Sequence, residues 1–160
     1  MIFITLGSQK FQFNRLLKAM DDLVKRGVIK DEVFAQTGYS DYLPEHFGSE
    51  SFLDRDEFMN HMKKSDVIVT HGGTGAIVTA LKNNKRVMAM ARLAEFNEHV
   101  DDHQVQIVEA FDKLNLIAKV ESELEIESVL KTIFERSFEN YVSNTENIIS
   151  SIEVFILNLK

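Results

Sequence analysis

The sequence predicts an α/β fold: a Rossmann-like, mostly parallel sheet with helices on both faces and further helices at the C-terminus. Two observations support this expectation. Short apolar runs alternate along the chain with longer segments in which apolar residues recur at helical spacing. Strands and helices that alternate in this way are joined by right-handed crossovers into a parallel sheet.

Six short runs rich in apolar and β-branched residues predict the strands. They lie, in chain order, at residues 2–6, 33–36, 51–53, 66–70, 87–91 and 116–120. The first run ends at Gly7-Ser8, where a strand would leave the sheet. The run at residues 87–91 is apolar throughout, as expected of a strand covered on both faces. The run at residues 51–53 is the shortest of the six and predicts only a weak strand.

The segments between these runs predict helices. The first begins at Asn14, and its apolar residues share one face until Gly27 stops it. The second begins at Asp54, whose spacing to Glu57 predicts a capping box. A third follows the glycines at residues 72–75. A fourth follows a polar loop at residues 92–100 and turns three apolar residues inward, at positions 105, 108 and 111.

We expect one domain over residues 1–160, of which residues 122–160 form a C-terminal helical extension. The end of this extension carries one apolar face at helical spacing, formed by Ile148, Ile149, Ile152, Phe155, Ile156 and Leu159. This face either packs on the domain's own sheet, docks a partner subunit or lies on a membrane surface. Glu146 and Glu153 on the polar side disfavour the membrane.

Composition narrows the functional class. The chain has 160 residues, 27% of them charged, and a net charge of -7, which disfavours nucleic-acid binding. The absence of cysteine excludes disulfides and thiolate metal sites. We find no signal peptide and no apolar run long enough to cross a membrane, so a cytoplasmic location is expected.

The most informative motif of the sequence is a glycine-rich turn. Gly72, Gly73 and Gly75 follow the expected strand at residues 66–70 and precede a helix. Glycines let backbone N–H groups approach a ligand closely, and a helix N-terminus adds its dipole and unpaired N–H groups. Such a turn favours a phosphate or diphosphate. A tight strand-to-helix turn also needs glycine without any ligand, so the turn alone is weak evidence.

A polar cluster at residues 98–104 strengthens the case, because it opens another helix at the same edge of the sheet. Asp101 or Asp102 could serve only as a helix cap. His103 and Gln104 are not needed for capping, and their side chains suit hydrogen bonds to a polyhydroxylated ligand. His99 and His103 have a spacing that allows metal ligation, but a third ligand is missing, so no metal is expected.

Other phosphate and hydrolase motifs fit less well. The chain lacks a G-x-S-x-G nucleophile elbow. Ala76 stands where a P-loop would require G-K-[ST]. A nicotinamide-dinucleotide turn is a closer alternative, but the third glycine and the ribose-binding acid are both missing.

The paired segments T-H-G-G-T-G at residues 70–75 and E-H-V-D-D-H-Q at residues 98–104 resemble the donor-binding half of GT-B glycosyltransferases, the glycosyltransferase family 28 C-terminal domain. Residues 5–13, 36–38 and 84–85, together with Arg92, fit the same pattern. The resemblance extends to PssE/EpsF-type subunits of bacterial exopolysaccharide and capsule synthesis. It also extends to the cytosolic subunit of the split eukaryotic UDP-GlcNAc transferase.

The resemblance implies roles for individual residues. The diphosphate of a UDP-sugar would be held by amides at Gly72, Gly73, Thr74 and Gly75, bordered by His71. Other donor-binding positions would be Gly7, Ser8, Gln36, Phe52, Leu53, Arg92, Asp102, His103 and Gln104. Gln104 is the best candidate for a sugar hydroxyl, and Phe52-Leu53 lie where relatives contact uracil. His99 and Glu98 are the candidate general bases, unless the base lies on a partner.

The resemblance also implies that this chain is a hexosyltransferase subunit that acts only with a partner. A membrane-associated subunit would bind the acceptor, a lipid-diphosphate-linked saccharide, and hold this chain at the inner face of the membrane. Inverting transfer without metal or other cofactor is expected, with galactose in β-1,4 linkage as the preferred donor assignment. The alternatives are a non-catalytic enhancer subunit of the same complex and a nicotinamide-dinucleotide-binding domain. The chain alone is a candidate homo-oligomer.

Overall fold

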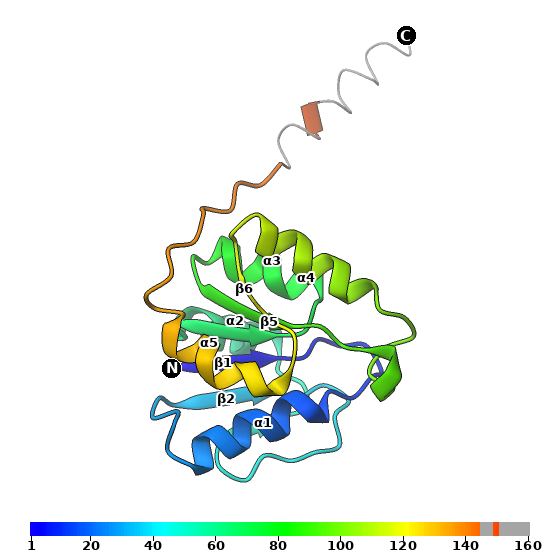
Figure 1. Cartoon of the computed structure of the whole chain (residues 1–160), viewed down its shortest axis with the longest axis vertical. Helices are drawn as coiled ribbons and strands as arrows, with labels where there is room; N and C mark the ends of the chain where they lie inside the picture. Colours follow the sequence, from blue (N-terminus) through cyan, green and yellow to red (C-terminus); the bar gives the residue numbers. More distant parts are fainter. Residues whose placement is uncertain (145–148, 151–160) are drawn as a thin grey trace.

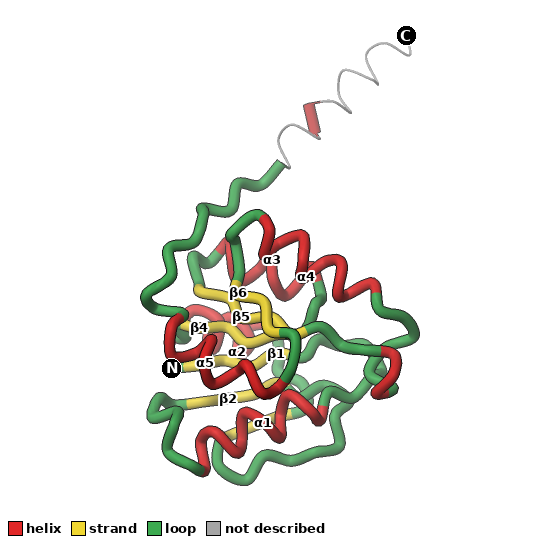
Figure 2. Tube along the Cα trace, in the orientation of Figure 1, coloured by secondary structure: helices red, strands yellow, loops and turns green. Residues whose placement is uncertain are grey.

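The protein is built around one parallel sheet with helices on both faces (Figures 1 and 2). The computed structural model describes residues 1–144 and 149–150. The sheet has six strands in the order β3-β2-β1-β4-β5-β6, and all five strand pairs are parallel. The predicted fold class is therefore confirmed.

The strands are β1 (Ile2–Thr5), β2 (Val33–Gln36), β3 (Gly48–Glu50), β4 (Val67–Thr70), β5 (Arg86–Met90) and β6 (Ala118–Val120). The central strands are in register at their carboxyl ends, because Thr5 is paired with both Gln36 and Thr70. The loops that follow β1, β2, β4 and β5 consequently leave the sheet along one rim. In a parallel sheet this rim is where ligands bind.

In the part of the chain that the structure describes, the helices that cover the sheet are α1 (Asn14–Lys25), α2 (Arg55–Lys64), α3 (Thr74–Lys82), α4 (His103–Lys113) and α5 (Ile126–Thr132). Two short 3₁₀ helices, η1 (Ala94–Phe96) and η2 (Glu123–Glu125), lie in the connecting loops. Helices α1 and α5 share a core with one face of the sheet. Helices α2, α3 and α4 share a core with the other.

Successive residues of each strand face opposite sides of the sheet, so the apolar core has two parts. Ile2 and Ile4 of β1 face α1 and α5, whereas Phe3 between them faces α2, α3 and α4. Because both faces are covered, the central strands are apolar almost throughout. The capping box expected at α2 is present: Asp54 accepts a hydrogen bond from the amide of Glu57, and the Glu57 side chain accepts one from the amide of Asp54.

The expected third strand was placed wrongly. The strand is Gly48–Glu50, paired with Phe34–Gln36, and the predicted run at residues 51–53 has already left the sheet. The side chain of Gln36 accepts a hydrogen bond from the amide of Leu53, which takes that amide out of the strand ladder. An edge strand such as β3 is largely exposed and carries no apolar signature by which the sequence could locate it.

The expected helical extension at residues 122–160 is also wrong over its described first part. Helix α5 ends at Thr132, and residues 136–144 have no regular secondary structure. This segment bonds to the α4–β6 turn instead: the amide of Glu139 donates to the Asn115 carbonyl, and the Asn115 side chain donates to the Ser137 carbonyl. Phe138 and Tyr141 add packing on the two cores.

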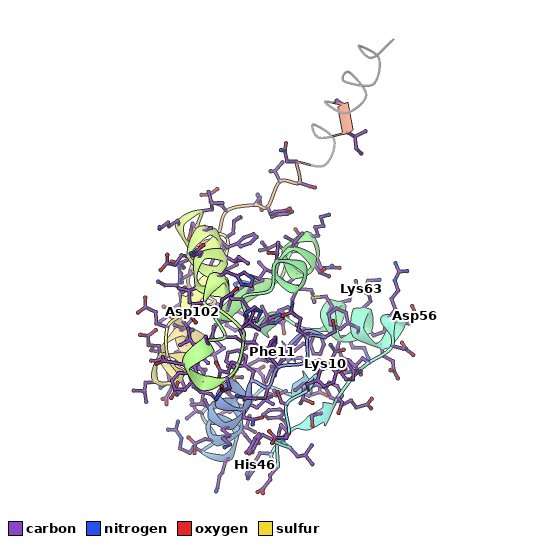
Figure 3. The ribbon with its side chains drawn as sticks, turned by 90° about the vertical axis from the view of Figure 1, so that its right-hand side faces the viewer. Lys10, Phe11, His46, Asp56, Lys63 and Asp102 are labelled. Carbon is purple, nitrogen blue, oxygen red and sulfur yellow. The ribbon has the colours of Figure 1, made fainter. Side chains whose placement is uncertain are left out.

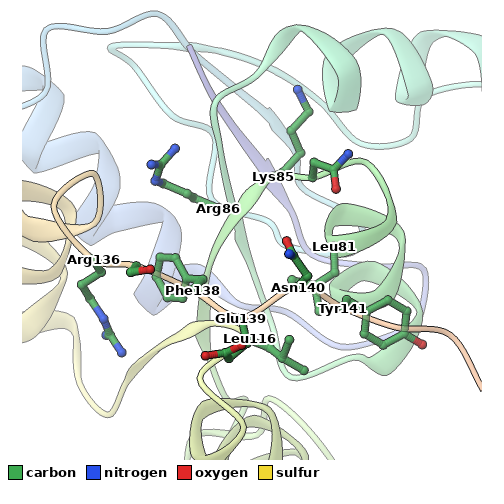
Figure 4. A pocket seen from close by; sticks show the side chains of 11 residues that line it. Leu81, Lys85, Arg86, Leu116, Arg136, Phe138, Glu139, Asn140 and Tyr141 are labelled. Atoms are coloured by element: carbon green, nitrogen blue, oxygen red, sulfur yellow. The ribbon is translucent and has the colours of Figure 1, made fainter.

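This crossing segment encloses a cavity of about 300 Å³ at the amino ends of β5 and β6, where Arg86, Arg136 and Phe138 are among the lining residues (Figure 4). Most of the expected apolar face at residues 148–159 lies outside the described residues, so its packing stays a prediction. In the described part of the chain, no helix is long and apolar enough to cross a membrane.

A buried carboxylate anchors the long connection between β2 and β3 to α1. Asp21 accepts hydrogen bonds from the Tyr42 hydroxyl (2.7 Å) and from the amides of Glu45 (3.1 Å) and His46 (2.8 Å). Burial alone would raise the pKa of Asp21, but these hydrogen bonds outweigh it and lower the pKa below its usual value of 3.8.

We predict that Asp21→Asn lowers the free energy of unfolding at pH 7 by about 1–3 kcal/mol, because an amide cannot satisfy all these donors. Since the folded-state pKa is lowered, the contribution of Asp21 is complete above the unfolded pKa and is lost as the pH falls through the folded value. Urea unfolding at pH 7 and below pH 4 measures both effects. Asp22→Asn, at an exposed ion pair with Arg26, is the control and should change stability by less than about 0.5 kcal/mol. Equal effects of the two variants would contradict the anchoring role.

Candidate functional site

A cavity of about 370 Å³ lies at the carboxyl rim of the sheet. Three segments line it: residues 7–9 of the β1–α1 loop, residues 71–76 of the glycine turn and the start of α3, and residues His103, Gln104 and Ile107 of α4. Figure 3 faces this rim and labels Phe11 of the β1–α1 loop and Asp102 of the β5–α4 loop. The two loops meet where the Phe11 ring packs on His99, at 5.1 Å between ring centroids. The two motifs identified in the sequence therefore share one cavity.

His71 fills the centre of the glycine turn. A Cβ added at Gly7 would lie 2.7 Å from the His71 ring, and one at Gly73 would overlap the ring even more closely, so neither position has room for a side chain. Gly7 also has a positive φ of 73°. At Gly75 an added Cβ would meet nothing within 4 Å, so packing does not explain the glycine there.

The imidazole of His71 is buried and neutral. Its Nδ1 lies 3.3 Å from the Thr70 hydroxyl and 3.5 Å from the Thr5 carbonyl, while the Thr70 hydroxyl donates to that carbonyl. Nδ1 is therefore the protonated nitrogen. Burial, reinforced by the Arg92 charge, lowers the pKa of His71 to about 4.

Two helix N-termini border the cavity. Gly73 is the N-cap of α3, and no side chain caps that helix. The first N–H groups of α3 thus remain available to an acceptor, with the helix dipole behind them. At α4, the Asp101 carboxylate accepts a hydrogen bond from the amide of His103 at 3.1 Å. Asp102 is the N-cap residue, but its carboxylate accepts from the amide of Ala94, so the side-chain hydrogen bond at the helix N-terminus comes from Asp101.

Gln104 is packed against the glycine turn. It is buried, and a Cβ added at Gly72 would come within 2.8 Å of its Cβ and carbonyl oxygen. Its side-chain oxygen lies 3.4 Å from the amide of Arg92. Gly72 thus permits the close approach of α4 that completes the cavity wall.

Arg92 does not line the cavity, in contrast to the sequence-based expectation. Its side chain is completely buried, and its Nη2 donates to the carbonyls of Leu6 (2.8 Å) and Phe11 (3.1 Å). Burial lowers its pKa to about 10, despite the nearby Glu98 charge, so it remains charged at neutral pH. Arg92 therefore positions the β1–α1 loop instead of binding a ligand directly.

The two candidate bases, Glu98 and His99, are engaged in contacts within the protein. Glu98 is 1% exposed, and both carboxylate oxygens accept from the Arg15 guanidinium, at 3.2 and 3.0 Å. His99 is also buried, with Nε2 3.1 Å from the Gln9 side-chain oxygen. Neither residue is among those lining the cavity. We therefore revise their assignment from candidate bases to residues that hold the loops together.

Gln36, Phe52 and Leu53 lie farther along the rim. Gln36 is buried and bonded to the Leu53 amide. Phe52 is half exposed and lies edge-to-face with Tyr39 at 5.2 Å between ring centroids. Leu53 packs on the core that contains Ile77 of α3. None of the three residues lines the cavity. Phe52 and Leu53 could therefore contact a ligand only if it extended out of the cavity.

From the sequence alone, Asp101 was not recognised as a possible third metal ligand beside His99 and His103. His99, Asp101 and His103 each place one ligand atom within 4.8 Å of the others. The alternating spacing H-x-D-x-H was the signal that could have identified it. Asp101 already caps α4 and contacts the imidazoles of both His99 and His103, so hydrogen bonding within the protein accounts for the cluster.

Similarity to solved structures defines the class of the protein as a Rossmann-like single half-domain of the GT-B type. The solution structure of ALG13 aligns with a TM-score of 0.56 at 15% identity and covers 89% of each chain. A kitacinnamycin glycotransferase aligns with a TM-score of 0.56 at 14% identity, over 85% of this chain and 35% of that one. The glycosyltransferase SnogD from Streptomyces nogalater aligns with a TM-score of 0.52 at 15% identity, over 74% of this chain and 31% of that one.

Residues 1–157 match the glycosyltransferase family 28 C-terminal domain, and the chain belongs to this family. A human protein, the UDP-N-acetylglucosamine transferase subunit ALG13, is 27% identical over an alignment of 105 positions, which covers 61% of this chain. The match spans only 9% of the human protein. The expected relation to the family and to the eukaryotic subunit is thereby confirmed.

We predict that Gly72→Ala destabilises the protein by about 1–3 kcal/mol, because the new methyl group forces α4 away from the turn. Thermal unfolding followed by circular dichroism measures the effect. Gly75→Ala is the matched control: it has open space and should leave stability unchanged or raise it by up to about 1 kcal/mol. Equal stability of Gly72→Ala and the wild type would show that the close approach is not required.

We also predict that Arg92→Met loosens the β1–α1 loop, because the carbonyls of Leu6 and Phe11 lose their donor. Amide exchange in residues 7–12 should accelerate about tenfold or more, which corresponds to about 1.4 kcal/mol in the opening equilibrium. Hydrogen-exchange mass spectrometry measures it. Arg86→Met, at the opposite end of the sheet, should leave this loop unchanged. Unaltered exchange in Arg92→Met would refute the positioning role.

Proposed function

We propose that this chain is the donor-binding catalytic subunit of a two-component glycosyltransferase that transfers a sugar from a UDP-sugar to a lipid-linked saccharide. The observation that supports this most directly is the shared cavity. The uncapped N-terminus of α3 faces His103 and Gln104 across a space of about 370 Å³. One wall supplies neutral donors suited to a diphosphate, and the other supplies side chains suited to sugar hydroxyls.

In the proposed mechanism, the amides at residues 73–75 and the α3 dipole bind the diphosphate and stabilise the charge that develops as UDP leaves. Gln104 and His103 orient the sugar, and uracil extends over Leu53. An acceptor hydroxyl attacks the anomeric carbon from the side opposite the diphosphate, which inverts its configuration. Because Glu98 and His99 are engaged elsewhere, the base that takes the hydroxyl proton belongs to the partner subunit.

Exposed apolar residues on the rim support the need for a partner. Several large side chains that are about half exposed or more lie on the loops after β2, β3 and β5, namely Tyr39, Leu43, Phe52, Phe96 and Val100. An apolar rim around a ligand cavity is typical of an interaction surface. The proposed partner is membrane-associated and binds the lipid-diphosphate-linked acceptor. It would hold this chain at the cytoplasmic face of the membrane.

The proposals for the donor sugar, the linkage and the biosynthetic process rest on the family resemblance of the motifs at residues 70–75 and 98–104. We propose a PssE/EpsF-type role in exopolysaccharide or capsule synthesis, with UDP-galactose as donor and β-1,4 linkage. We further propose that transfer needs no metal, because the glycine turn and two helix dipoles already provide positive potential at the diphosphate. The cluster of His99, Asp101 and His103 is the place where an added metal would bind and test this point.

The decisive experiment combines the chain with its acceptor-binding partner and measures sugar transfer from a panel of UDP-sugars. We predict transfer that persists in EDTA and falls about tenfold to a hundredfold in Gln104→Ala, which loses one or two hydrogen bonds to the donor. Gln106→Ala, an exposed position on the same helix, is the control.

Each other outcome identifies a different function. Unchanged transfer in Gln104→Ala, with donor binding lost, indicates a non-catalytic enhancer subunit. Calorimetric binding of NADH but not of UDP indicates a nicotinamide-dinucleotide domain, an assignment that the family match disfavours. Loss of activity in EDTA that is restored by zinc would overturn the metal-independent mechanism.

A further inference from the structure

We propose that the cavity at the amino ends of β5 and β6 binds a phosphate monoester, with Arg86 as the main anchor (Figure 4). The cavity lies at the opposite end of the strands from the glycine turn and shares no lining residue with the cavity there. A ligand here would be additional to the sugar donor, and its binding does not depend on the proposed sugar transfer.

Two segments supply most of the cavity lining. They are residues 84–86, where the chain enters β5, and residues 136–141 of the segment that crosses over the end of the sheet. Asn115 holds the crossing segment in place, because it bonds to the Ser137 carbonyl and to the Glu139 amide. A cavity of about 300 Å³ lies at the lower end of the range for small-molecule sites, about 300–1,000 Å³. It therefore suits a small ligand.

The lining is basic, although the protein as a whole is acidic. It contains Lys85, Arg86 and Arg136 but only one acid, Glu139, whereas the chain has 25 acidic residues and 18 lysines and arginines. The lining thus has an excess of two positive charges at neutral pH. A phosphate monoester carries a charge of about −1.5 to −2 at this pH, and a carboxylate carries a single charge. Charge balance therefore favours a phosphate.

Arg86 has an unmet hydrogen bond. Within the described residues, its buried Nε has no hydrogen-bond partner. Its guanidinium carbon lies 5.2 Å from the centre of the Phe134 ring, a cation–π contact that restricts the orientation of the group. A buried N–H without an acceptor is unfavourable. A phosphate oxygen in the cavity would supply the acceptor, and a guanidinium can bind phosphate through two N–H groups.

The acids beside these cations do not neutralise Arg86. Asp66 accepts a hydrogen bond from the N-terminal ammonium of Met1 at 2.9 Å. Asp112 lies 3.9 Å from the Arg136 guanidinium, too far for a hydrogen bond. In the part of the chain that the structure describes, neither acid forms an ion pair with Arg86. Both arginines therefore keep donors for a ligand.

Other lining residues provide further donors. Lys85 donates to the Lys63 carbonyl at 2.6 Å, which uses one of its three N–H groups. Asn84, Asn140 and Tyr141 add neutral polar side chains that suit the hydroxyl groups of an organic phosphate. The ligand class is therefore a small hydroxylated phosphate ester. Such a group occurs in free sugar or glycerol phosphates and in the headgroup of a phospholipid.

The test titrates the full chain with glycerol 3-phosphate and follows backbone amide signals by NMR. Signals of residues 84–86 and 136–141 should shift and saturate, whereas residues 73–75 report separately on the glycine-turn cavity. Acetate, with one charge, should bind at least about tenfold more weakly. Phosphatidylcholine vesicles with and without phosphatidic acid present the same phosphate group on a lipid, and co-sedimentation measures that binding.

Three variants locate the site. Arg86→Met should raise the dissociation constant for glycerol 3-phosphate at least about tenfold, because it removes the anchoring charge-assisted hydrogen bonds. Lys82→Met removes the same charge from an exposed position outside the lining and should change it less than about twofold. Glu139→Gln, at an exposed position, removes the acid of the lining and should tighten binding about threefold. Matching melting temperatures would show that Arg86→Met is folded, and Glu139→Gln decides alone if it is not.

Binding of glycerol 3-phosphate at residues 84–86 supports the proposal with a free ester as ligand. Binding only to vesicles that contain phosphatidic acid supports it with a lipid headgroup as ligand. Shifts confined to residues 73–75, equal binding by Arg86→Met and Lys82→Met, or no binding to either probe would overturn it. Failure of UDP to shift residues 73–75 would remove the proposed function and leave this site intact.

Discussion

The architecture of the rim depends on one buried guanidinium. Arg92 follows β5, yet it donates to two carbonyls of the loop that follows β1, two strands away in the sheet. The contacts of His99 with Gln9 and of Gln12 with the Phe96 carbonyl add to this connection. Nη2 makes both of these bonds, whereas Nε and Nη1 of the buried guanidinium have no hydrogen-bond partner within the described residues. The two bonds from Nη2 connect the β5–α4 loop to the β1–α1 loop.

The glycine turn depends on the loops that Arg92 holds. His71 occupies the space that side chains at Gly7 and Gly73 would need, and Gln104 occupies the space that one at Gly72 would need. The turn, the β1–α1 loop and α4 therefore fit together only because three positions lack a Cβ. Gly75 has no such packing constraint, and its backbone remains open to a ligand.

The electrostatic character of the cavity follows from the same arrangement. The charged residues near it are paired within the walls, Arg15 with Glu98 and Asp101 with His103. Within the described residues, the cavity lining contains backbone amides and the side chains of histidine and glutamine but no lysine, arginine, aspartate or glutamate, and helix dipoles lie behind it. Such a surface suits the nucleotide-sugar donor that we propose, and the exposed apolar residues on the loops after β2, β3 and β5 suit the proposed partner.

Local sequence patterns were enough to predict the parallel α/β fold, the glycine turn and the polar segment at residues 98–104, because strand and helix periodicity and backbone sterics are local properties. They located β3 wrongly, because an exposed edge strand has no apolar pattern, and they predicted a helical extension where residues 136–144 have no regular secondary structure. Only the tertiary structure decided which polar side chains face the cavity. Arg92, Glu98 and His99 are polar residues at the right rim, yet their partners lie far away in the chain, at Leu6, Arg15 and Gln9. No local pattern reveals such partners, because only folding brings them within hydrogen-bonding distance.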